Sequence, residues 1–105
     1  MRDSEAMASA ATVSPSIDRQ KAALIGRALA DPKRLCVLEC LSAGERSVRE
    51  LSAEAGCQVP NMSQHLAVLR HAGLVTTRRD GSTVYYRLAD ARVLEACSLL
   101  TSLAR

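Results

Sequence analysis

The chain reads PNMSQHLAVLR from Pro60 to Arg70, and the pattern of this segment is the most informative in the sequence. Proline is favoured in the first turn of a helix, where its missing N–H costs nothing. The apolar residues that follow recur at helical spacing: Met62, Leu66 and Leu69. The stretch therefore predicts a helix that turns one apolar face toward a core.

A second short helix is predicted immediately upstream. Ser47 and Glu50 have the spacing of a capping box, in which each side chain accepts a hydrogen bond from the other residue's backbone N–H. We expect this helix to run to about Ala55, because Gly56 breaks the chain there. Two short helices joined by a glycine-containing turn are typical of the helix-turn-helix motif.

A β-hairpin is predicted on the other side of the Pro60–Arg70 helix. The runs 74–78 and 83–88 are rich in β-branched and aromatic residues, and they flank the sequence RDGS at 79–82. Asp80-Gly81 is a strong hairpin signal, because both residue types tolerate positive φ. Such a hairpin is the wing of a winged helix-turn-helix.

Helices are also predicted from 17 to 30, from Pro32 to about 43, and from about 91 to Leu103. Asp31 and Asp90 can cap the second and third of these. The last helix carries more apolar residues than one small domain can cover, namely Val93, Leu94, Ala96, Cys97, Leu100 and Ala104. A dimer would bury them.

The composition fits a single mainly helical domain. The chain has 105 residues, and 48% of them are apolar, but it has no Phe or Trp and only two Tyr. We expect residues 1–16 to form a disordered tail and residues 17–105 to form one DNA-binding and dimerisation domain. The predicted fold class is mainly α with a small β-hairpin (α+β), a homodimeric winged helix-turn-helix.

No stretch has the length and hydropathy of a signal peptide or a membrane span. We therefore expect a cytoplasmic protein. Its four cysteines should then be reduced thiols rather than structural disulfides.

The charge distribution points to a nucleic-acid partner. The net charge of +3 is small, but residues 57–87 contain four arginines and only one acidic residue, Asp80. The uncharged polar residues of the 60–70 helix suit the edges of bases in the major groove, and the arginines of the hairpin suit phosphates. The candidate DNA-binding residues are Asn61, Ser63, Gln64, His65, Arg70, Arg78, Arg79 and Arg87.

Four stretches of this sequence carry a family pattern. They read ALADPKRL at 28–35, SVREL at 47–51, SQHLAVLR at 63–70 with AGLV at 72–75, and RDG at 79–81 followed by VYY at 84–86. From about Ala22 to Ala104 the chain closely resembles the ArsR/SmtB, or arsenic-repressor, family of bacterial metal and redox sensors.

The resemblance implies an obligate homodimer, formed by the first and last helices, that represses genes by occupying an imperfect inverted repeat in double-stranded DNA. It implies that the 60–70 helix is the recognition helix and that the hairpin reaches flanking DNA. It also implies that an inducer lowers the affinity for DNA.

Two inducer sites of the family are absent from this sequence. The arsenic-type site needs cysteines within the stretch that here reads SVREL, and there are none. The zinc-type site needs Asp and His pairs on the last helix. Asp90 is present, but Arg92 stands where a His is expected and no His follows.

The remaining candidates for sensing are thiols. Cys36 and Cys40 lie one helical turn apart and could offer two sulfurs to a soft ion such as As(III), Cu(I), Cd(II) or Zn(II), with Cys97 as a third ligand. Thiol oxidation or persulfidation without a metal would use the same atoms. Alternatively, all three cysteines are small buried hydrophobes. Cys57 lies in the turn before the recognition helix and could report to DNA or be a spectator.

Two other classes of function compete with a repressor. An enzyme would need a constellation of acid, base or nucleophile, but both histidines lie on one predicted helix and the carboxylates are scattered, so we expect no enzyme. The alternative is a winged-helix interaction module without an inducer that binds protein or nucleic acid constitutively. Salt-dependent binding to a duplex would distinguish the two.

Overall fold

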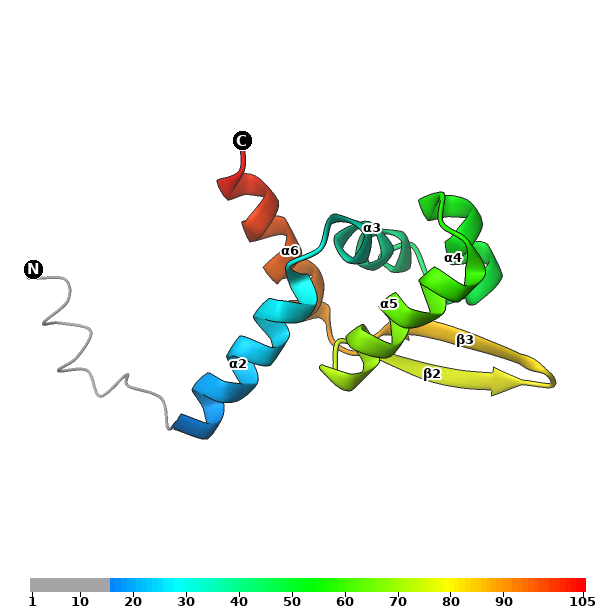
Figure 1. Cartoon of the computed structure of the whole chain (residues 1–105), viewed down its shortest axis with the longest axis horizontal. Helices are drawn as coiled ribbons and strands as arrows, with labels where there is room; N and C mark the ends of the chain where they lie inside the picture. Colours follow the sequence, from blue (N-terminus) through cyan, green and yellow to red (C-terminus); the bar gives the residue numbers. More distant parts are fainter. Residues whose placement is uncertain (1–15) are drawn as a thin grey trace, which may run out of the picture.

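The computed structural model describes residues 16–105, which form a winged helix-turn-helix (Figure 1). The elements are α2 (Ser16–Leu29), α3 (Pro32–Leu41), β1 (Arg46–Ser47), α4 (Val48–Ala55), α5 (Val59–His71), β2 (Val75–Asp80), β3 (Thr83–Leu88) and α6 (Ala91–Leu103). The fold class expected from the sequence is confirmed. The expected disordered tail lies outside the described residues except for Ser16, which opens α2.

The core lies where α3, α4 and α5 meet. Its fully buried side chains are Val37, Leu38, Leu51, Met62, Leu66 and Leu69. The inner face predicted for the 60–70 helix is therefore confirmed. Burial of each such leucine contributes about 1.5–3 kcal/mol to the stability of the fold. The core therefore fixes the inner face of α5, while the opposite face stays exposed.

The predicted caps set the helix boundaries. Asp31 accepts hydrogen bonds from the backbone N–H groups of Lys33 at 2.8 Å and Arg34 at 3.1 Å. The capping box of α4 is complete, with Ser47 N–H donating to the Glu50 carboxylate at 2.8 Å and Glu50 N–H donating to Ser47 Oγ at 3.2 Å. Gly56 ends α4 in the left-handed region at φ 67°.

The wing belongs to a three-stranded antiparallel sheet with strand order β1-β3-β2. The two-residue strand β1 pairs Arg46 with Tyr86 and Ser47 with Tyr85, and nothing so short was expected from the sequence. The hairpin loop is also tighter than expected. Asp80 pairs with Thr83 as the last strand residue, so the loop consists of Gly81 and Ser82, with φ 63° at Gly81.

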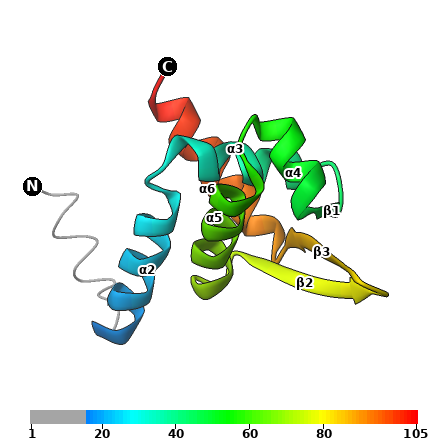
Figure 2. The ribbon, with the colours of Figure 1, turned by 45° about the vertical axis from the view of Figure 1, so that its right-hand side comes forward.

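The molecule is elongated, with principal extents of 54 × 30 × 21 Å. The wing projects at one end, whereas α2 and α6 lie toward the other (Figures 1 and 2). The outward side of α6 exposes four leucines: Leu94, Leu99, Leu100 and Leu103. Within residues 16–105, no helix has the length and hydropathy needed to span a membrane.

Candidate nucleic-acid interface

The exposed side of α5 carries several polar residues and no acid, although Val59 and Val68 are also exposed there. Asn61, Ser63 and Gln64 are all exposed in its first half, and Arg70 is exposed in its last turn. The side chain of the N-cap residue, Gln58, makes no capping hydrogen bond to the N-terminus of α5. The positive end of the helix dipole is therefore open to an anion. This face can donate and accept hydrogen bonds without an electrostatic penalty near a polyanion.

Two hollows separate α5 from neighbouring elements. One of about 550 Å³ lies between Ser63, the first turn of α4 and strand β3. The other, of about 530 Å³, lies beside Ser63, Arg70 and Tyr86. Ser63 and Tyr86 line both of them, so the polar residues of α5 and the wing border a shared concave surface.

His65 is placed differently from the other candidates on α5. Its ring is half-buried and points toward the start of α3, where the Arg34 guanidinium donates to His65 Nδ1 at 3.4 Å. The sequence predicts His65 to be one of the DNA-binding residues of this helix, because periodicity alone does not show which neighbour a residue at the edge of a helix face contacts.

Arg78 and Arg79 lie on opposite faces of the wing. The register pairs Arg78 with Tyr85 and Arg79 with Val84, and successive strand residues point to opposite sides of a sheet. Arg79 therefore shares a face with Tyr86, which lines the hollow beside α5. Among residues 16–105, no hydrogen bond or ion pair engages the Arg79 guanidinium, so it is available to a phosphate.

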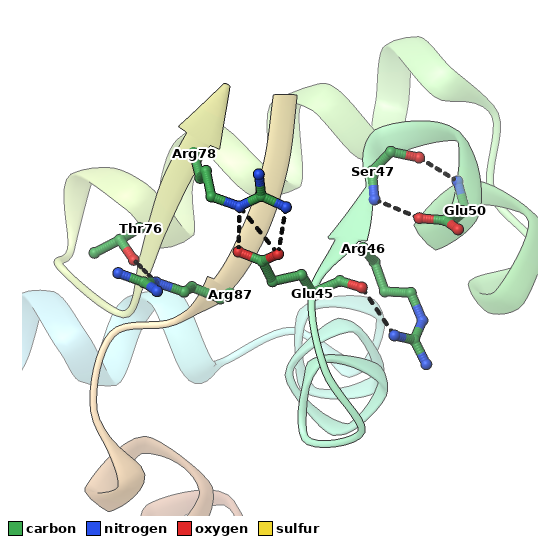
Figure 3. A network of polar contacts seen from close by, with 7 residues as sticks. All are labelled: Glu45, Arg46, Ser47, Glu50, Thr76, Arg78 and Arg87. Atoms are coloured by element: carbon green, nitrogen blue, oxygen red, sulfur yellow. Dashed lines mark hydrogen bonds and ion pairs between the residues drawn. The ribbon is translucent and has the colours of Figure 1, made fainter. Parts of the chain in front are cut away.

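Arg78 is hydrogen-bonded to another residue of the same chain (Figure 3). Its Nε and Nη2 atoms donate to the Glu45 carboxylate at distances between 2.7 and 3.1 Å, and its guanidinium lies 5.0 Å from the centre of the Tyr85 ring. The pair lowers the pKa of Glu45 and raises the pKa of Arg78, in each case mainly through the side-chain hydrogen bond between them. The charge that the sequence analysis assigned to DNA is thus balanced by a carboxylate.

Arg87 shares the wing face of Arg78. Its Nε donates to Thr76 Oγ1 at 3.2 Å on the opposite strand (Figure 3). Arg87 stays exposed. Its hydrogen bond links the two strands at the base of the hairpin, and this partner is an uncharged hydroxyl.

Sequence reasoning missed Arg49 as a candidate contact. Arg49 is exposed in the first turn of α4 and lines the hollow shared with Ser63 and the wing. Its signal in the sequence was its place just inside the capping box, at the start of the helix that precedes the recognition helix.

The four cysteines do not form one cluster. Cys36 and Cys40 are half-buried side by side on α3, and burial, followed by the neighbouring Cys36 and Glu54, raises the pKa of Cys40 to about 11. Cys97 is buried on α6, and desolvation with the nearby Glu39 raises its pKa. Cys57 is half-buried, and its thiol donates to the carbonyl of Gln58 at 3.5 Å.

Residues 16–105 of a single chain do not form a metal site with three protein ligands. In residues 16–105, no three His, Cys, Asp or Glu side chains lie close enough together to hold an ion. The third ligand suggested for the Cys36 and Cys40 pair, Cys97, is therefore not brought to it by this chain alone.

Comparisons with known proteins agree with this architecture. A family model described as "Bacterial regulatory protein, arsR family" matches residues 31–77, which contain the helix-turn-helix. The HTH-type transcriptional regulator KmtR of Mycobacterium tuberculosis is 52% identical over 67 residues, covering 64% of this chain and 52% of KmtR. This chain thus spans about half the length of KmtR.

Two further relatives match over more of their length. The biofilm growth-associated repressor of Agrobacterium fabrum is 41% identical over 87 residues, covering 78% of this chain and 74% of the repressor. A homodimeric winged helix-turn-helix DNA-binding domain from Mycobacterium bovis, solved by NMR, is 34% identical with a TM-score of 0.78, covering 85% of this chain and 82% of that domain. By fold and by the two relatives that are covered over most of their length, the chain belongs to the bacterial arsR family of regulatory proteins, a family of transcriptional regulators.

Proposed function

We propose that this protein is a transcriptional repressor that binds double-stranded DNA through α5 and the wing. The observation that carries the proposal is the set of exposed polar residues on α5, which has no acid, together with Arg79 on the wing face that bears Tyr86. In this proposal α5 is the recognition helix, with Gln64 and Asn61 reading base edges in the major groove and Ser63 reading bases or phosphates. Arg79, Arg49 and Arg70 contact the backbone.

We also propose that the repressor acts as a homodimer in the cytoplasm and occupies an inverted repeat. The M. bovis relative is homodimeric. On this chain α6 and the adjoining α2 form the surface best suited to a second copy, because exposed leucines gather on α6 and a hollow lined by Ile25 and Leu29 of α2 lies next to it. A two-fold dimer would present two α5 helices to two half-sites.

DNA binding can be tested with a duplex chosen by the protein itself. The wild-type protein selects ligands from a random 30-bp library, and fluorescence anisotropy then measures its affinity for the selected duplex and for a scrambled one across a salt series. Tight binding that weakens with salt is expected. If the protein binds no duplex at low salt, the repressor proposal is overturned and a protein-binding module replaces it.

Gln64→Ala tests the assignment of the recognition helix. Loss of one bidentate base contact costs about 1–3 kcal/mol, so the selected duplex should bind at least several-fold more weakly while the scrambled duplex is little affected. Gln20→Ala, at an exposed position of α2, is the matched control. An equal loss on both duplexes would contradict a base contact by Gln64.

We further propose that Cys36 and Cys40 receive the inducing signal, a thiol-reactive compound or a soft ion that two thiols can hold. Their adjacency on α3 supports this, and the absence of a three-ligand group in the described protomer speaks against a conventional zinc site. Cys97 is the third candidate, from α6.

The test adds Hg(II), As(III), Cd(II), Zn(II), Cu(I), persulfide or peroxide to the protein–DNA complex. We expect one of these to release DNA from the wild type but not from a Cys36→Ser, Cys40→Ser, Cys97→Ser triple variant. Cys57→Ser is the control. Release from the triple variant at wild-type concentrations would overturn the role of these thiols and leave the repressor standing.

A further inference from the structure

We propose that Arg34 is a positioning residue for DNA recognition: it donates a hydrogen bond to Nδ1 of His65, which places the ring proton on Nε2, and so ties the recognition helix α5 to the end of α2. The proposal rests on the repressor function proposed above. It concerns two residues that do not belong to the exposed face of α5. It joins a surface suited to dimerisation with the surface suited to DNA.

Arg34 lies at the corner where α2 ends and α3 begins. Its side chain is only 16% exposed. The Nε atom donates to the carbonyl of Ala28 at 2.6 Å, and Nη2 donates to the carbonyl of Arg27 at 3.1 Å. The last carbonyls of a helix have no partner within the helix, so this guanidinium caps the C-terminus of α2.

The same guanidinium reaches α5. Arg34 Nη1 lies 3.4 Å from His65 Nδ1. Arginine has donors and no acceptor, so Nδ1 must be the acceptor and the ring proton must sit on Nε2. Arg34 thereby leaves Nε2–H of His65 as a donor.

The residue before Arg34 makes a parallel contact to the helix that precedes α5. Lys33 Nζ donates to the carbonyl of Ala55 at 2.5 Å, at the C-terminus of α4. Ala55 directly precedes Gly56, where the turn of the helix-turn-helix begins. Two consecutive cations on α3 therefore cap two different helices, and the distal end of Arg34 adds the link to α5.

These contacts make the position of α5 depend on α2. The apolar core fixes how deeply α5 packs, but apolar contacts are non-directional. Hydrogen bonds have angular preferences, and Arg34 applies them to both helices through one rigid planar group. A shift of the end of α2 therefore moves the anchor of His65.

The first test is spectroscopic and needs no DNA. Long-range ¹H–¹⁵N correlation spectra of the ¹⁵N-labelled full chain report which ring nitrogen of His65 carries the proton. We expect the proton on Nε2, and Arg34→Gln should move the Nδ1 resonance, whereas Arg27→Gln should leave it in place. A proton on Nδ1 in the wild type would overturn the proposal.

The second test uses two amides at position 65. In His65→Asn the side-chain carbonyl oxygen falls near the place of Nδ1, so Arg34 keeps an acceptor. In His65→Gln the amide reaches the place of Nε2 and the Nδ1 acceptor is lost. The backbone cap on α2 is intact in both variants, and glutamine is the better helix former of the two.

We expect His65→Gln to lose about tenfold in affinity for the selected duplex, the effect of about one hydrogen bond to a charged group. His65→Asn should retain clearly more affinity than His65→Gln. If His65→Gln binds as well as or better than His65→Asn, the proposal is overturned, because helix propensity would explain that order.

Arg34→Gln should weaken selected-duplex binding more than Arg27→Gln, which removes the same charge from an exposed residue of α2. Thermal unfolding shows whether Arg34→Gln still folds, and if it does not, the pair at position 65 decides. A wild-type protein that binds no duplex would refute the repressor function, whereas the position of the ring proton would still decide the Arg34–His65 contact.

Discussion

Arg78 and Arg79 are neighbours in the chain, but the pleat of β2 gives them different surroundings. Arg78 contacts Glu45 and the Tyr85 ring. Arg79 lies on the opposite face of the wing, the face whose Tyr86 borders the hollow beside α5. Of these two adjacent arginines, Arg78 therefore links the wing to Glu45, whereas Arg79 is available to bind a polyanion. The difference is measurable in the salt dependence of binding.

Arg79→Gln should reduce the slope of log affinity against log salt by about one, as expected for the loss of one phosphate contact. Arg78→Gln combined with Glu45→Gln removes a balanced pair and should leave the slope nearly unchanged. Anisotropy titrations at several salt concentrations measure both slopes. If the double variant loses as much slope as Arg79→Gln, Arg78 leaves Glu45 to bind DNA.

Cys40 should be a slow nucleophile at neutral pH. Its pKa of about 11, compared with an ordinary value of 9.0, reflects burial first and then Cys36 and Glu54. Since the thiolate is the reactive form, alkylation of Cys40 should accelerate only toward pH 11. Mass spectrometry of iodoacetamide-treated protein follows this rate, and Glu54→Gln should shift the profile to lower pH. A midpoint at or below pH 9 would contradict this account.

At the scale of the element, the turn between α4 and α5 depends on Gly56. Its φ of 67° lies in the left-handed region, which costs a residue with a Cβ about 1–2 kcal/mol. No atom lies within 4 Å of a Cβ built there, so the backbone conformation alone is at issue. Gly56→Ala should lower the free energy of unfolding by about that amount. Gly56→Asn should lower it less, because Asn tolerates this region. Urea denaturation of both variants measures the difference, and equal losses would point to another cause.

The start of α3 depends on the charge of Asp31. Two backbone N–H groups donate to its carboxylate, and its pKa is lowered mainly by the hydrogen bond from Arg34. A lowered pKa means that Asp31 stabilises the fold above the unfolded value near 3.9 and loses that effect as the pH falls through the folded value. Asp31→Ala should therefore cost about 1 kcal/mol at neutral pH, and less in acid.

Asp31→Asn is the matched control for this cap. Asparagine caps helices about as well as aspartate but does not titrate. Thermal unfolding at pH 7 and at pH 3 should show that the gap between Asp31→Asn and Asp31→Ala stays constant, whereas the gap between wild type and Asp31→Ala narrows at low pH. A constant wild-type gap would show that the charge is irrelevant.

For the molecule as a whole, the exposed apolar side of α6 bears on how two copies of the chain assemble. Leu99 is 66% exposed and Leu103 is 81% exposed. In a homodimer built on α6, a charge at Leu99 would be buried without a partner, which is costly. Leu99→Glu should therefore convert the dimer to a monomer in sedimentation velocity and weaken operator binding.

Val59→Glu is the control for this prediction, because Val59 is also an exposed apolar residue but lies at the start of α5. It should leave the sedimenting mass unchanged. A dimer that survives Leu99→Glu would place the interface elsewhere on the molecule.

The sequence alone determined the order of the elements and the family. Local signals carry that information: the caps at Asp31, Ser47 and Asp90, the break at Gly56 and the helical spacing of Met62, Leu66 and Leu69 all act within a few residues. Each was found in the structure as expected. Strand β1 was missed because two residues have no periodicity of their own and pair only where Tyr85 and Tyr86 are already in place.

Tertiary structure alone decided what each candidate side chain meets. Glu45 binds Arg78 across 33 positions of sequence, and Arg34 reaches His65 across 31. Periodicity can say that a residue lies at the edge of a helix face, but the neighbour it meets depends on how distant elements pack. For the same physical reason, the sequence could list eight residues for DNA, whereas the packing separated the exposed face of α5 and Arg79 from the internally engaged Arg78 and His65.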